Sequence, residues 1–137
     1  MRLNGMTAVV TGGASGMGES MVYALAKEGA AIVVVDKNLD GADAVASNVE
    51  KEGGKAICVR ADVQSTEDLD AMANEAMDTF RQVNILVNNA GARVIKGFLE
   101  HTKEDWDIIA RSGASVLEVG LESVSYTHLT LPTNREV

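Results

Sequence analysis

The chain has 137 residues, of which 46% are hydrophobic and 23% charged, and its formal net charge is -8. This balance is typical of a compact folded domain and excludes a disordered or fibrous chain. The acidic charge, with twelve Lys and Arg scattered along the sequence, provides no basic surface for nucleic acid. No segment approaches the ~18 apolar residues of a membrane span, so we expect a cytoplasmic protein with neither a nucleic-acid nor a membrane partner.

The single cysteine and the two histidines indicate neither a disulfide nor a metal. Cys58 has no second cysteine to pair with, and its apolar neighbours Ile57 and Val59 favour a small buried hydrophobe in a strand. His101 and His128 have no further ligand at metal-binding spacing. We therefore predict no metal site.

In the first 63 residues, short apolar runs alternate with segments in which apolar residues recur at helical spacing. The apolar run 6–11 ends in the sequence GGASGMG, and apolar residues then recur at helical spacing as far as Gly29. Residues 30–36, AAIVVVD, are typical of a strand that is covered on both faces. A second helical pattern ends at Gly53 and Gly54, and residues 55–63, KAICVRADV, predict a third strand.

The alternation continues beyond residue 63. Ser65 can cap a helix whose apolar positions all follow helical spacing, namely Leu69, Met72, Ala73, Ala76, Met77 and Phe80. Residues 84–91, NILVNNAG, predict a fourth strand and a turn, and Thr102 with Asp105 begins a last helix through Trp106. Strands that alternate with helices in this way predict an α/β fold, a doubly wound parallel sheet with helices on both faces.

Ligands of such sheets bind at the carboxyl ends of the strands, where this chain places glycines. Residues 11–18, TGGASGMG, follow the first strand. Glycines let the backbone approach a pyrophosphate, and the N-terminus of the following helix offers N–H groups and a partial positive charge. The turn therefore predicts a dinucleotide, and a purely structural tight turn is the alternative.

Polar side chains follow the other three strands. Asp36 lies at about the ~20-residue separation at which an acid reaches the adenosine ribose hydroxyls, and it would repel a 2'-phosphate, although the neighbouring Lys37 weakens that argument. Asp62 could meet the adenine amino group, and Asn88 and Asn89 could tie adjacent strand ends together and face the cofactor. The alternatives are a solvated acid for Asp36, a capping or turn residue for Asp62, and a simple turn for the two amides.

The segments TGGASGMG, VVVD, ADV and NNAG, in this order and spacing, resemble the classical short-chain dehydrogenase/reductase family over residues 1 to about 110. The resemblance implies a Rossmann-type NAD(P)-binding domain over residues 1–112 and hydride transfer between a nicotinamide cofactor and an alcohol/carbonyl pair. Among its members, the chain resembles the 3-oxoacyl-carrier-protein reductases. The implied cofactor is NAD in preference to NADP. The full-length parent is expected to act on a small-molecule alcohol or ketone and to be a homo-oligomer.

The resemblance also implies a role for individual residues. Carried over onto this sequence, it places the pyrophosphate against Gly12, Ser15, Gly16, Met17 and Gly18, the ribose against Asp36, the adenine against Asp62 and Val63, and the middle of the cofactor against Asn89, Ala90 and Gly91.

The catalytic residues of the family have no match in this chain. The family places an Asn about seven residues after the Trp, then a Ser, and then a Tyr-x-x-x-Lys pair in which the Lys lowers the Tyr pKa. Here residues 111–114 after Trp106 read RSGA, and Tyr126 is followed four residues later by Thr130. We therefore assign no catalytic residue and expect this chain only to bind cofactor. A non-catalytic dinucleotide-binding module is the alternative, whereas a methyltransferase or nucleotide-sugar epimerase fits the glycine spacing less well.

The end of the sequence has a separate explanation. Residues 124–133, VSYTHLTLPT, match a transposase-type sequencing adapter read in codons, without a mismatch. We therefore expect an N-terminal fragment, truncated after the fourth strand and the following helix, in which residues 113–137 are an uncertain to non-native tail. Whether residues 110–123 are native, frameshifted or chimeric stays open.

Overall fold

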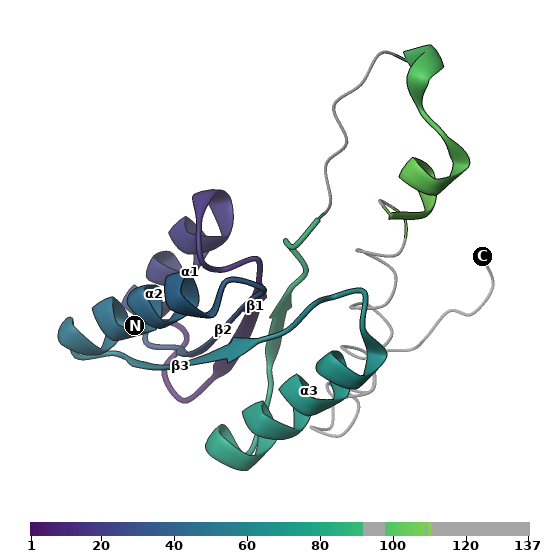
Figure 1. Cartoon of the computed structure of the whole chain (residues 1–137). Helices are drawn as coiled ribbons and strands as arrows, with labels where there is room; N and C mark the ends of the chain where they lie inside the picture. Colours follow the sequence, from purple (N-terminus) through teal and green to yellow (C-terminus); the bar gives the residue numbers. More distant parts are fainter. Residues whose placement is uncertain (92–97, 109, 111–137) are drawn as a thin grey trace.

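Strands and helices alternate along the part of the chain that the computed structural model describes, residues 1–91, 98–108 and 110 (Figure 1). The sheet is parallel throughout, with the strand order β3-β2-β1-β4. The predicted α/β, doubly wound class is confirmed. The elements are β1 (Thr7–Thr11), α1 (Gly16–Lys27), β2 (Ala31–Asp36), α2 (Leu39–Lys51), β3 (Lys55–Arg60), α3 (Thr66–Phe80), β4 (Ile85–Val87) and a short 3-10 helix (Phe98–Glu100).

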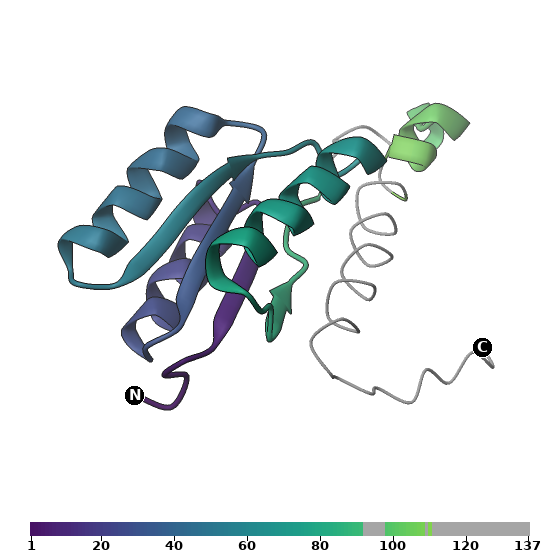
Figure 2. The same ribbon diagram turned by 90° about the horizontal axis from the view of Figure 1, so that it is seen from below.

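Helices cover both faces of the sheet, with α1 and α2 on one side and α3 on the other (Figure 2). Successive side chains of a strand point to opposite faces, so β1 contributes to two cores. Val9 packs in the cluster that contains the α3 residue Leu69, whereas Val10 packs in the cluster that contains Val22 of α1. In β2, residues 32–35 are all buried, which confirms the strand covered on both faces.

Two helix starts follow the predicted capping residues. Ser65 accepts a hydrogen bond from the Asp68 N–H through its side chain, at 3.2 Å, at the start of α3. Residues 103–108 are helical, and Thr102 and Asp105 exchange backbone-to-side-chain hydrogen bonds of 2.9 and 3.2 Å in front of them. These side chains satisfy N–H groups that have no partner within a helix.

The expectation of a buried Cys58 is wrong. The residue is only half-buried, because β3 is an edge strand of the described sheet. Its Sγ donates a hydrogen bond to the Asp43 carboxylate, at 3.6 Å. The pKa of the Cys58 thiol is raised, mainly by its partial burial and next by the neighbouring Asp43 carboxylate.

Among the described residues, no helix is long and apolar enough to cross a membrane, and no three potential metal ligands gather in one place. The predictions that concern Tyr126, Thr130 and the adapter-like residues 124–133 lie outside the described part of the chain.

Candidate dinucleotide-binding site

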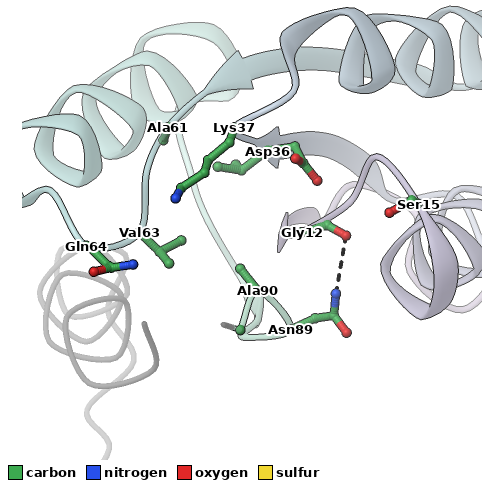
Figure 3. A pocket seen from close by; sticks show the side chains of 11 residues that line it. Gly12, Ser15, Asp36, Lys37, Ala61, Val63, Gln64, Asn89 and Ala90 are labelled. Atoms are coloured by element: carbon green, nitrogen blue, oxygen red, sulfur yellow. Dashed lines mark hydrogen bonds between the residues drawn. The ribbon is translucent and has the colours of Figure 1, made fainter. Parts of the chain in front are cut away.

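A pocket of about 310 Å³ lies at the carboxyl ends of the strands (Figure 3). After β3 the chain returns across the sheet to place β4 on the far side of β1, so the strand order reverses direction at β1. This switch point is where doubly wound sheets bind their ligands. The residues that line the pocket are Gly12, Ser15, Val35, Asp36, Lys37, Ala61, Val63, Gln64, Asn89, Ala90 and Gly91.

Two glycines in the first turn of α1 are needed for different structural reasons. A Cβ on Gly18 would lie 2.0 Å from the Gly12 carbonyl oxygen and 2.7 Å from Nδ2 of Asn89, so this glycine allows α1 to pack against the loop. Gly16 has a φ of +57°, and a Cβ there would meet no atom of the described residues within 4 Å. Gly16 therefore leaves its backbone open to a ligand, whereas Gly18 serves packing.

Thr11 and Asn89 join the ends of β1 and β4. The buried Thr11 hydroxyl donates to the Val87 carbonyl at 3.3 Å and accepts from the backbone N–H groups of Asn89 and Ala90, at 3.1 and 3.0 Å. In return, Nδ2 of Asn89 donates to the carbonyl oxygens of Thr11 and Gly12, at 3.1 and 3.3 Å; the second bond is the dashed line in Figure 3. The tie between strand ends that was predicted for Asn88 and Asn89 is present for Asn89. This role of Thr11 was not predicted from the sequence.

Asp36 is held beside the glycine loop by two backbone donors. Its Oδ2 accepts from the Ala14 N–H at 3.1 Å, and its Oδ1 accepts from the Asn38 N–H at 3.0 Å. A carboxylate has about four acceptor sites, so each oxygen can still accept a hydroxyl group. The side chain is therefore an oriented acceptor at the wall of the pocket.

Both carboxylate oxygens of Asp62 have partners within the protein. Its Oδ1 accepts from the Gln64 N–H at 2.9 Å, which is the turn role that the sequence analysis left as an alternative. Its Oδ2 lies 3.4 Å from Nζ of Lys37. The pKa of Asp62 is lowered, first because its carboxylate accepts the Gln64 N–H and then because Lys37 lies close by.

The structure brings most of the predicted residues to one pocket. The predicted residues that line it are Gly12, Ser15, Asp36, Val63, Asn89, Ala90 and Gly91, and those that do not are Gly16, Met17, Gly18 and Asp62. Lys37 also lines the pocket, and so do three residues that were not predicted, Val35, Ala61 and Gln64. These three carry no chemical signal of their own, and only their positions next to strand ends could have indicated them.

Together, the glycine loop at a helix start, the acid at the end of β2 and the pocket at the switch point define a dinucleotide-binding α/β domain. A family model described as short chain dehydrogenase matches residues 6–124. The chain belongs to the short-chain dehydrogenase family.

Individual relatives agree with this assignment. The chain is 36% identical to 3beta-hydroxysteroid dehydrogenase 2 of Eggerthella lenta, over 90% of this chain and 45% of that protein. A mutant short-chain dehydrogenase/reductase of Serratia marcescens has a TM-score of 0.84 and 33% identity, over 92% of this chain and 52% of that one. A blue fluorescent protein from a metagenomic library, solved with NADPH, has a TM-score of 0.84 and 27% identity, over 93% and 53%. The chain thus spans about half the length of these relatives.

Proposed function

We propose that the chain is the N-terminal, cofactor-binding part of an NAD(P)-dependent oxidoreductase. The full-length parent would move hydride between a nicotinamide cofactor and an alcohol/carbonyl pair of a small molecule, and would be a homo-oligomer. The observation that carries the proposal is the pocket at the switch point, which gathers the glycine loop, Asp36 and residues 89–91. When bound, the nicotinamide supplies or accepts the hydride, and the protein supplies binding and orientation.

The residues present fit such a cofactor. Ser15 caps α1 without a side-chain hydrogen bond, and the N–H groups of a first helical turn have no partner within the helix. These groups, with the open backbone at Gly16, would hold the pyrophosphate together with Gly12, Met17 and Gly18. Asp36 would accept the adenosine ribose hydroxyls, Val63 and Asp62 would lie toward the adenine, and Asn89, Ala90 and Gly91 would face the middle of the cofactor.

NAD is the preferred cofactor in this proposal. Asp36 presents a carboxylate whose two oxygens are already oriented by backbone N–H groups, and it would repel a 2'-phosphate on the ribose that it binds. The metagenomic relative was solved with NADPH, so a related fold accommodates a 2'-phosphate. In this proposal the acid at the end of β2 disfavours that phosphate here.

The chain on its own would bind cofactor without turning it over. After Trp106 its sequence has neither the family's Asn nor a Tyr-x-x-x-Lys pair, and so lacks the groups that would move a proton beside the hydride. Tyr23 and Lys27 have the Tyr-x-x-x-Lys spacing, but they lie in α1, before the cofactor-binding acid in the sequence. We infer that residues 113–137 are an uncertain to non-native tail and that residues 124–133 are translated adapter. The family match ends at residue 124, where the adapter resemblance begins, which supports the inference for residues 124–133; residues 113–123 lie within the match. Reading the source gene beyond codon 110 tests it, and an uninterrupted genomic copy of residues 124–137 would overturn it.

Binding of NADH to the 137-residue chain, measured by calorimetry, tests the proposed site. Gly16→Ala is expected to abolish detectable binding, because its Cβ would project into the space in front of the α1 N-terminus. Gly53→Ala is the matched control: Gly53 also has a positive φ and an open Cβ position, but it lies at the other end of the sheet. Unchanged NADH affinity in Gly16→Ala, or an equal loss in both variants, would contradict the assignment of this loop.

A further inference from the structure

An ion pair at the rim of the pocket joins the ends of two strands. Lys37 follows β2, and its Nζ lies 3.4 Å from Oδ2 of Asp62, which follows β3. Lys37 lines the pocket, whereas Asp62 does not. The Lys37 side chain extends toward Val63 and Gln64, away from the carboxylate of Asp36 (Figure 3). The lysine therefore points to the β3 side of the pocket, although it is the sequence neighbour of Asp36.

Asp62 is the better fixed partner of this pair. Its Oδ1 accepts the Gln64 N–H at 2.9 Å, and its own N–H donates to the Asp68 carboxylate at 2.9 Å. The Asp68 carboxylate in turn lies 3.5 Å from Arg60. The Asp62 side chain is 33% exposed and that of Lys37 is 60% exposed. A flexible lysine thus meets a carboxylate whose position is set by the backbone.

The position of Lys37 matters because of what lies on the other side of the pocket. There, Asp36 is held by the N–H groups of Ala14 and Asn38, with its negative charge at the wall. A 2'-phosphate on an adenosine that meets Asp36 would face that charge. A lysine is a mobile point charge and a good phosphate ligand, so a released Lys37 could turn toward such a phosphate.

We propose that Asp62 sets cofactor selectivity through Lys37, by holding the lysine on the β3 side of the pocket and so leaving the repulsion between Asp36 and a 2'-phosphate uncompensated. Lys37 is then the specificity-determining residue, and Asp62 is a positioning residue that acts through it. The inference rests on the proposed dinucleotide site and adds to it a reason why a lysine beside Asp36 is compatible with a preference for NAD.

The test compares two soluble probes that need only the adenosine half of the site. Adenosine 5'-monophosphate and adenosine 2',5'-bisphosphate are titrated into the full 137-residue chain, and the ratio of their dissociation constants is followed by NMR. Because both probes carry the same adenine, any direct effect of Asp62 on the base cancels in the ratio. Asp62→Asn keeps the oxygen that accepts the Gln64 N–H, so the turn is retained.

Asp62→Asn is expected to strengthen binding of the bisphosphate relative to the monophosphate about fivefold. This factor corresponds to the upper range of the free energy of an exposed ion pair. In the Lys37→Gln background, the shift caused by Asp62→Asn should be less than half as large, since no ammonium is then released. Asp70→Asn is the charge-matched control, because Asp70 is an exposed acid of α3 that does not line the pocket, and it should leave the ratio unchanged.

Two results would overturn the inference. An equal shift in the Lys37 and Lys37→Gln backgrounds would show that loss of the Asp62 charge acts alone, and no shift in either would show that Lys37 is not held back. If the unaltered chain binds neither probe, the proposed function fails and takes this inference with it. Binding of both probes with an unchanged ratio in Asp62→Asn overturns this inference alone.

Discussion

The two ends of the sheet carry hollows of different kinds. The one at the amino ends is the larger, about 590 Å³ against about 310 Å³ at the carboxyl ends, and Met1, Gly29, Lys55 and Phe80 are among its lining residues. At the carboxyl ends, Asp36 and Asn89 are oriented by hydrogen bonds to the backbone of neighbouring loops. Oriented polar groups, rather than volume, therefore distinguish the candidate site.

The hydrogen bonds that join β1 to β4 also differ between the two ends of the sheet. At the amino end, Asn84 accepts from the Thr7 N–H at 2.8 Å and donates its own N–H to the Thr7 carbonyl at 2.9 Å. At the carboxyl end, the Thr11 hydroxyl makes its bonds to Val87, Asn89 and Ala90. Both ties hold the strands together, but only the second fixes backbone that lines the pocket.

The two ends of the sheet should differ most in stability when a glycine is replaced, and the largest loss is expected at Gly18. Gly18→Ala places a Cβ 2.0 Å from a backbone oxygen, which only a backbone shift can relieve, so we expect a loss of about 3 kcal/mol in the free energy of unfolding. At the amino end, Gly53→Ala introduces only an unfavourable positive φ and should lose about 1 kcal/mol. Urea denaturation of both variants measures the difference, and equal losses would remove the special role of Gly18.

Thr11 is expected to have the next largest effect. Thr11→Val is similar in shape but removes the hydroxyl that bonds three backbone groups. The Ala90 N–H loses its partner, whereas the Asn89 N–H and the Val87 carbonyl keep the 3.1 Å bond between them, so we expect a loss of about 2 kcal/mol in the free energy of unfolding. Thr11→Ser retains the hydroxyl and is expected to keep most of that stability. Denaturation curves compare the two, and an equal loss in both would assign the effect to the missing methyl group.

Asn84 provides the comparison with Thr11 for NADH binding. Asn84→Ala should lower the free energy of unfolding by about 1 kcal/mol, and it should leave the NADH affinity of the folded chain unchanged. Thr11→Val should weaken NADH binding as well, because the backbone of Asn89 and Ala90 loses its support. Calorimetry on the folded fractions tests this distinction; reduced NADH affinity in Asn84→Ala would break it.

The last comparison concerns a single carboxylate at each end. Asp36→Ala removes an oriented acceptor and should weaken adenosine 5'-monophosphate binding about tenfold, the loss expected for a hydrogen bond to a charged group. Glu52→Ala removes an exposed acid beside the larger hollow and should leave binding unchanged. NMR titration measures both affinities, and a similar loss in Glu52→Ala would point to general electrostatics instead of a site at Asp36.

The sequence by itself determined the order of the elements, the helix starts at Ser65 and Thr102, and the acid that follows β2. These features depend on periodicity and on capping within a few residues, so local patterns suffice to predict them. Only the tertiary structure decided that Gly18 packs against Gly12, that Thr11 holds the loop after β4, and that Asp62 turns toward Lys37. Those contacts depend on where each strand end lies beside its neighbours. Asn89 and Thr11 are 78 residues apart in the sequence, and they meet because β4 pairs with β1.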